Sequence, residues 1–131
     1  LALFGVPKPL ANHADTAVQA ALETLEHLKA WNDAREKKNL PRIECGIGIH
    51  TGPLCHGMIG SAKRREYTVV GDTVNTASRL QDLTKMLGSQ LVVSAQTKSM
   101  LEAVPNLTKQ EGVMLKGRTE SIEVYSWSSK L

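Results

Sequence analysis

The stretch YTVVGDTVNTASRL, residues 67–80, places a strand directly before a helix. Its first half is rich in β-branched residues, which favour a strand, and the Gly71-Asp72 pair interrupts that pattern. Asp72 stands where an N-cap is expected, so a helix is predicted from about Asp72 to Leu87, with Gly88 ending it. The apolar residues of this helix predict the side that faces a sheet: Val74, Ala77, Leu80, Leu83 and Leu87.

Two polar residues, Asn75 and Arg79, are four apart and share a helix face away from the centre of the apolar stripe. Spacing alone favours two solvated residues, because the polar face of a helix is usually exposed to solvent and binds nothing. The alternative is that both side chains project towards an anionic ligand. Arginine suits phosphate because its planar guanidinium donates two parallel hydrogen bonds and stays charged.

The remaining sequence predicts an α+β domain with a largely antiparallel sheet covered by helices. The helices are expected at residues 13–31, before a fraying polar tail, and after Ser94, ending at Val104-Pro105. The other elements are expected to be a buried strand at 1–4, a central strand at 42–50, its partner at 54–60, a basic hairpin tip at 61–66, a strand at 90–94 and a hairpin at 107–127. Gly46 and Gly48 in the central strand predict close backbone approach.

Composition fits one globular domain, with 131 residues, 41% hydrophobic and 22% charged. No apolar run is long enough to span a bilayer. Cys45 and Cys55 are expected to be reduced and in or near the core of a cytoplasmic domain. Cys55, His50 and His56 match no closed zinc site. The net charge of +3 comes without an aromatic platform or a phosphate-binding P-loop motif, so neither a nucleic-acid nor a P-loop protein is predicted.

The quoted stretch resembles the signature of the class III nucleotidyl cyclases. Further segments follow in that family's order and spacing: LALFGVP, HADTAVQAALE, GIGIHTGPLCHGMIGS, LVVS, LKG and SIEVYSW. The resemblance implies a ferredoxin-like cyclase fold that lacks its first strand-helix segment. Residues 1–131 would then be the C-terminal two-thirds of one catalytic domain.

The resemblance also implies a reaction and the residues that serve it. Members of the family form a 3',5'-cyclic nucleotide and pyrophosphate with two Mg²⁺ or Mn²⁺ ions. Asn75 matches the asparagine that orients the ribose, and Arg79 matches the arginine that stabilises charge at the α-phosphate. Lys116 matches a lysine that contacts the outgoing phosphates, although by itself it is an ordinary hairpin lysine. Thr68 falls where the family reads the base and resembles the adenylyl cyclases of bacteria and the soluble branch, which favours ATP.

The partner implied is a second cyclase domain in a head-to-tail homodimer, with each active site between two domains. Lys63, Arg64 and Arg65 resemble the dimerisation arm, while solvated charge explains them equally well. The family's metal-binding aspartates lie upstream of Leu1, so the 131 residues alone are expected to be inactive. Gly46 stands where some members have an arginine for the terminal phosphates. Two alternatives stay open: a catalytically silent dimerisation or regulatory module, and a guanylyl cyclase.

Overall fold

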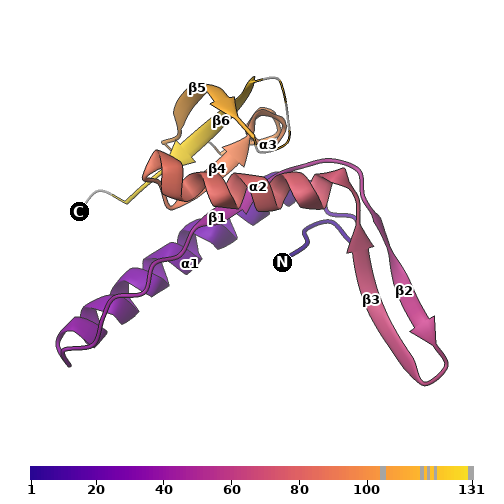
Figure 1. The fold of residues 1–131 in the computed structure, drawn as a ribbon, viewed down its shortest axis with the longest axis horizontal. Coiled ribbons are helices and arrows are strands. Elements are labelled where there is room, and N and C mark those ends of the chain that lie inside the picture. Colours follow the sequence, from indigo (N-terminus) through magenta and orange to yellow (C-terminus); the bar gives the residue numbers. More distant parts are fainter. Residues whose placement is uncertain (104–105, 116, 118, 120, 130–131) are drawn as a thin grey trace.

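The computed structural model describes residues 1–103, 106–115, 117, 119 and 121–129 (Figure 1). In chain order the elements are α1 (His13–Glu36), β1 (Ile47–Ile49), β2 (Cys55–Ser61), β3 (Arg64–Val70), α2 (Asp72–Leu87), β4 (Leu91–Ser94), α3 (Ala95–Ser99), β5 (Thr108–Met114) and β6 (Ser121–Trp127). The α+β class is confirmed, as is the extent of the helix over α2. No helix in the described part is both long and apolar enough to cross a membrane.

Four strands form the main sheet in the order β1-β4-β6-β5. β1 runs parallel to β4, and the β4–β6 and β6–β5 pairs are antiparallel, which confirms the predicted C-terminal hairpin. The central strand predicted at residues 42–50 is wrong, because β1 is short and lies at the sheet edge. The residues just before β1 lie against α1 instead. There the side-chain amide of the buried Asn32 donates to the Ile43 carbonyl and accepts from the Ile43 backbone amide, both at 2.8 Å.

β2 and β3 pair with each other in a separate two-stranded sheet, which projects from one end of α2 as an arm (Figure 1). The prediction that residues 54–60 pair with the central strand is therefore wrong. The turn at residues 62–63 lies within the predicted basic tip. Cys45 and Cys55 are exposed free thiols, not core residues; Cys55 lies on this arm, where no second layer covers it within the described residues.

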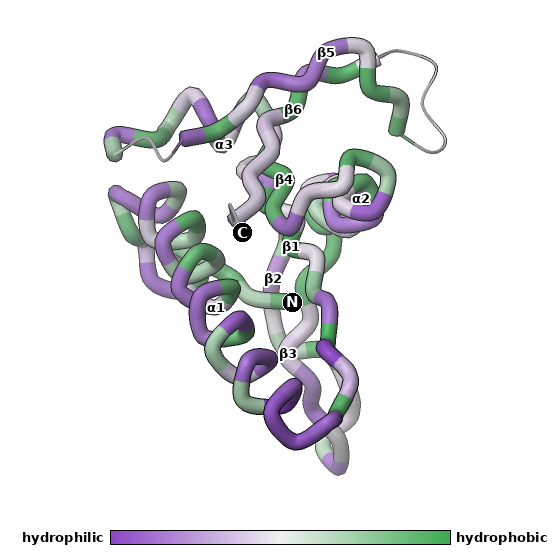
Figure 2. The backbone as a smooth tube through the Cα atoms, turned by 90° about the vertical axis from the view of Figure 1, so that its left-hand side faces the viewer, coloured by the Kyte–Doolittle hydropathy of each residue, from purple (hydrophilic) through white to green (hydrophobic). Residues whose placement is uncertain are grey.

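α1 and α2 cover opposite faces of the main sheet. Alternate residues of β4 point to opposite sides, so Leu91 and Val93 pack with α1 while Val92 packs with Leu80 and Leu83 of α2. Figure 2 shows β4 as a hydrophobic stretch between the two helices. All four residues of β4 are buried. Of the predicted α2 stripe, Leu80 and Leu83 are fully buried and Leu87 packs against them, whereas Val74 and Ala77 are partly buried.

The ends of α1 differ from expectation. The polar tail does not fray, because helix α1 continues to Glu36. Arg42 holds that end by binding Asp33 at 3.0 Å and Glu36 at 3.1 Å, and the hydrogen bond to Asp33 contributes most to raising the pKa of Arg42. Asn12 is the N-cap residue at the other end, although its side chain makes no capping hydrogen bond.

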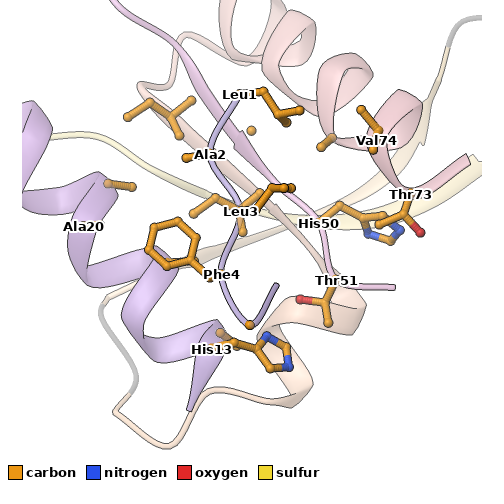
Figure 3. A pocket seen from close by; sticks show the side chains of 18 of the residues that line it. Leu1, Ala2, Leu3, Phe4, His13, Ala20, His50, Thr51, Thr73 and Val74 are labelled. Carbon is orange, nitrogen blue, oxygen red and sulfur yellow. The ribbon is translucent and has the colours of Figure 1, made fainter. Parts of the chain in front are cut away.

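Residues 1–4 do not form the predicted strand. They line a cavity of about 1020 Å³ between α1, β1 and α2, and pair with none of the described strands (Figure 3). Without a partner backbone a strand has no ladder to join. The predicted cap at Ser94 is confirmed, since its hydroxyl accepts the Thr97 amide at 3.2 Å, but α3 ends at Ser99. Val104 and Pro105, the predicted end, lie outside the described residues.

Candidate active site

The strand-to-helix break at Gly71 determines where α2 begins and so where Asn75 and Arg79 lie. Gly71 has φ 143° and is the N-cap of α2, a backbone conformation that glycine adopts without strain. Asp72 is the first helical residue and Gly71 is the N-cap, so the predicted position of Asp72 as N-cap is wrong. The Thr73 hydroxyl donates to the Pro53 carbonyl and ties the first turn of α2 to the loop after β1.

α2 lies unusually close to β1 because two glycines leave room for it. A Cβ on Gly48 would stand 2.3 Å from the Gln81 nitrogen and 2.5 Å from the Ala77 oxygen. A Cβ on Gly46 would stand 2.1 Å from the Thr84 hydroxyl oxygen. The predicted close approach is confirmed, with the helix backbone as the neighbour at Gly48. This contact sets the distance of α2 from the sheet.

Asn75 and Arg79 lie on successive turns of α2, at the flank of the face that carries the buried Leu80 and Leu83. Asn75 is exposed and Arg79 is half-buried. Gly117, in the loop between β5 and β6, approaches the same arginine, since a Cβ there would lie 3.9 Å from Arg79 Nη2. The neighbouring Lys116 lies outside the described residues. The structure therefore brings the loop that carries Lys116 to the guanidinium of Arg79.

Thr68 lies on the arm rather than on α2. It is half-buried in β3, directly opposite Gly57 of β2, and β3 leads through Gly71 into α2. The predicted site residues thus come from three elements: Thr68 from β3, Asn75 and Arg79 from α2, and the β5–β6 loop. The first three are connected through one continuous stretch of chain.

A second cavity, of about 310 Å³, opens beside this part of α2. Its polar lining includes His50, Asp72, Thr76 and Glu123. Glu123 accepts the Tyr125 hydroxyl at 2.5 Å, and this hydrogen bond is the main cause that raises the pKa of Tyr125. The lining of this cavity comes from α2, β4, α3 and β6 and from the segments that follow β1 and β5, so sequence spacing could not predict that these residues meet.

Hydrogen bonds among one imidazole and three hydroxyl groups join the ends of β1 and β4 at this cavity. His50 Nδ1 lies 2.9 Å from the Ser94 hydroxyl oxygen, which lies 3.1 Å from that of Thr97. Thr97 in turn lies 2.9 Å from the hydroxyl oxygen of Thr51. Ser94 and Thr97 are buried, so the network fixes the loop that follows β1. Sequence spacing excludes His50 from a zinc site but does not predict this contact with Ser94.

Among the residues that the structure describes, no three His, Cys, Asp or Glu side chains gather where they could hold a metal ion. The pair of divalent ions that the resemblance implies has no complete ligand set there. The groups present can orient and neutralise an anion: one guanidinium, one carboxamide and the hydroxyl on the arm.

Residues 1–128 match the family model described as the adenylate and guanylate cyclase catalytic domain. The chain belongs to this cyclase catalytic domain family. It is 36% identical over 128 residues to adenylate cyclase 1 of Rhizobium meliloti (strain 1021), a match that covers 95% of this chain and 19% of that protein. It is 35% identical over 120 residues to the adenylate cyclase of Anabaena cylindrica, covering 86% of this chain and 24% of that protein.

Solved structures of cyclases share the fold. The guanylyl cyclase Cya2 superposes with a TM-score of 0.81 at 28% identity, covering 94% of this chain and 61% of that one. A bacterial light-regulated adenylyl cyclase superposes with a TM-score of 0.72 at 26% identity, covering 90% of this chain and 34% of that one. The predicted cyclase fold is confirmed. The chain spans about a fifth to a quarter of the length of the two curated adenylate cyclases.

Proposed function

We propose that the protein is an adenylate cyclase whose catalytic domain includes this chain. The reaction converts ATP into 3',5'-cyclic AMP and pyrophosphate. The ribose 3'-oxygen forms a bond to the α-phosphorus and loses its proton, while the bond from the α-phosphorus to the bridging oxygen of the β-phosphate breaks. The products are a second messenger for signalling inside the cell and a diphosphate anion.

The observation that carries this proposal is the position of Arg79 on α2, next to the loop that contains Gly117. A half-buried guanidinium is better suited than an exposed one to stabilise the negative charge that builds up at the α-phosphate, because water screens it less. Asn75, one turn earlier, would hydrogen-bond the ribose. Lys116 would add a contact to the outgoing phosphates.

Mg²⁺ or Mn²⁺ belongs to the proposal as the divalent ion that would neutralise the triphosphate. The described residues supply no complete ligand set for it. The cytoplasm, where ATP is abundant, is the proposed location of the domain.

The proposal is tested by measuring cyclic AMP formation from ATP and Mn²⁺ with the full-length protein, with and without EDTA. We expect Arg79→Ala to lower kcat by about 100-fold or more, the usual effect of removing a group that stabilises transition-state charge. Asn75→Ala is expected to lower it as well, since the ribose would be misplaced. Lys85→Ala is the matched control, because it removes an exposed cation from the same helix.

Each other outcome has a definite meaning. Cyclic GMP from GTP, without cyclic AMP from ATP, would replace the proposal by a guanylate cyclase. No product from either nucleotide would favour the catalytically silent module. If Lys85→Ala lowered kcat as much as Arg79→Ala does, the role assigned to Arg79 would be wrong.

A further inference from the structure

The loop that follows β1, residues 50–54, is fixed on one side to the core of the domain. The Thr51 hydroxyl oxygen lies 2.9 Å from that of Thr97, and His50 Nδ1 lies 2.9 Å from the Ser94 hydroxyl oxygen. Ser94 and Thr97 are both buried where β4 meets α3. Buried polar groups that are paired in this way hold their partners in one arrangement. The start of the loop therefore has a fixed position relative to the sheet.

On its other side the same loop contacts the first turn of α2 through Thr73. The Thr73 hydroxyl donates to the Pro53 carbonyl, although the whole arm of β2 and β3 lies between these two residues in the chain. The Thr73 side chain also lies against Gly52, because a Cβ on that glycine would stand 2.7 Å from Thr73 Oγ1 and 3.4 Å from Thr73 Cγ2. Figure 3 shows His50, Thr51 and Thr73 around this part of the chain.

This first turn of α2 carries Asn75, two residues after Thr73. Its N-cap is Gly71, which has no side chain with which to cap the helix. The amides of Val74 and Asn75 donate to the Gly71 carbonyl at 3.2 Å and 3.4 Å, which is long for such bonds. The contact of Thr73 with the loop therefore ties the turn that carries Asn75 to the sheet.

We infer that Thr73 is a positioning residue for Asn75 and that it acts together with Thr51. This inference rests on the proposed function. The hydroxyl groups of Thr51 and Thr73 are the two ends of one series of contacts, which runs from the buried Thr97 through the loop to the first turn of α2. Without either hydroxyl, Asn75 keeps its carboxamide but is held less firmly at the ribose. Rate is sensitive to such a displacement, since about 1 Å can cost about 100-fold.

The first test is Thr73→Val in the full-length protein, assayed for cyclic AMP formation well below the temperature at which it unfolds. We expect kcat to fall about tenfold and the KM for ATP to stay within about twofold, because the group that is displaced acts on orientation. Thr73→Ser keeps the hydroxyl and is expected to restore kcat. Thr24→Val is the matched control, because the Thr24 hydroxyl donates to the Ala20 carbonyl within α1. Wild-type kcat in Thr73→Val, or an equal loss in Thr73→Ser, overturns the inference.

The second test is a double-mutant cycle between Thr51 and Thr73. Thr51→Val is expected to lower kcat in the same direction as Thr73→Val. The double variant is expected to lose no more than Thr73→Val alone, since both hydroxyl groups act through the same loop. Losses that simply multiply in the double variant would show two independent effects and overturn the joint role.

Hydrogen exchange separates this inference from the proposed function, because it needs no activity. Mass spectrometry of the peptide 71–76 is expected to show about tenfold faster exchange in Thr73→Val than in the wild type, and wild-type exchange in Thr73→Ser. If the wild type forms no cyclic AMP, the proposed activity is wrong, while faster exchange confined to this peptide still supports the contact made by Thr73. Unchanged exchange in Thr73→Val overturns the inference, as does faster exchange throughout the chain, which would indicate a general loss of stability.

Discussion

At the scale of single residues, Thr68 is where the choice between ATP and GTP is proposed to lie. Its side chain is half-buried on the arm, directly opposite Gly57. A hydroxyl both donates and accepts strong hydrogen bonds, whereas a thiol does so weakly. The identity of this one side chain is therefore expected to change which base is preferred.

Thr68→Cys is predicted to shift the ratio of kcat/KM for ATP over GTP towards GTP by about tenfold, which corresponds to about 1.4 kcal/mol, roughly one hydrogen bond. The ratio is measured by assaying cyclic AMP and cyclic GMP in parallel. Ser61→Cys is the control, because it places a thiol on the same arm near the tip. An unchanged ratio in Thr68→Cys would remove Thr68 from base recognition.

At the scale of elements, the packing of α2 on β1 holds Asn75 and Arg79 in place. At Gly48 the obstacle to a Cβ is the backbone of α2, which cannot move without the whole helix. At Gly46 the obstacle is the Thr84 side chain. The two glycines therefore test the same contact in different ways.

Gly48→Ala is predicted to lower the free energy of unfolding by about 1–3 kcal/mol, the usual effect of overpacking, and to lower activity by displacing α2. Urea unfolding measures the first effect and the cyclase assay the second. Gly46→Ala is predicted to be destabilising too, but partly rescued by Thr84→Ala in the double variant. A Gly48→Ala variant as stable as the wild type would show that α2 is free to shift.

At the scale of the whole molecule, the arm of β2 and β3 leaves apolar side chains exposed on a two-stranded sheet. A two-stranded hairpin is at best marginally stable by itself in water. On the face of the arm that does not carry Thr68, Met58 is 60% exposed and Tyr67 is 45% exposed, and they are directly paired. We propose that a second copy of this chain covers that face in a homodimer. Lys63 and Arg65, near the tip, belong to the same proposed interface.

Met58→Glu is predicted to raise the dissociation constant of the dimer by at least tenfold, because a charge would be buried without a partner. Sedimentation velocity over a range of concentrations measures it. Met86→Glu is the control, since Met86 is 70% exposed on α2, away from the arm. If both variants assemble like the wild type, the arm is not the interface; if activity falls together with dimer formation, the active site lies between two copies.

Local patterns were enough to predict α2, β3, β4, the cap at Ser94 and the C-terminal hairpin. Each of these depends on hydrophobic period, a cap or a turn within a few residues. The wrong strand predictions all concern long-range pairing: residues 1–4 join no described strand, β1 lies at an edge, and β2 pairs with β3 rather than with β1. Strand partners are chosen across the fold, and periodicity does not encode them.

The candidate site likewise combines residues that local patterns predict with contacts that they do not. The sequence by itself determined the family and the common face of Asn75 and Arg79, because four residues along a helix always return to the same side. Only the tertiary structure brought Gly117 to Arg79, joined His50 to Ser94, and set Gly57 opposite Thr68. Local sequence patterns do not predict these contacts, because they depend on how α2 packs against the sheet and on the register of the arm.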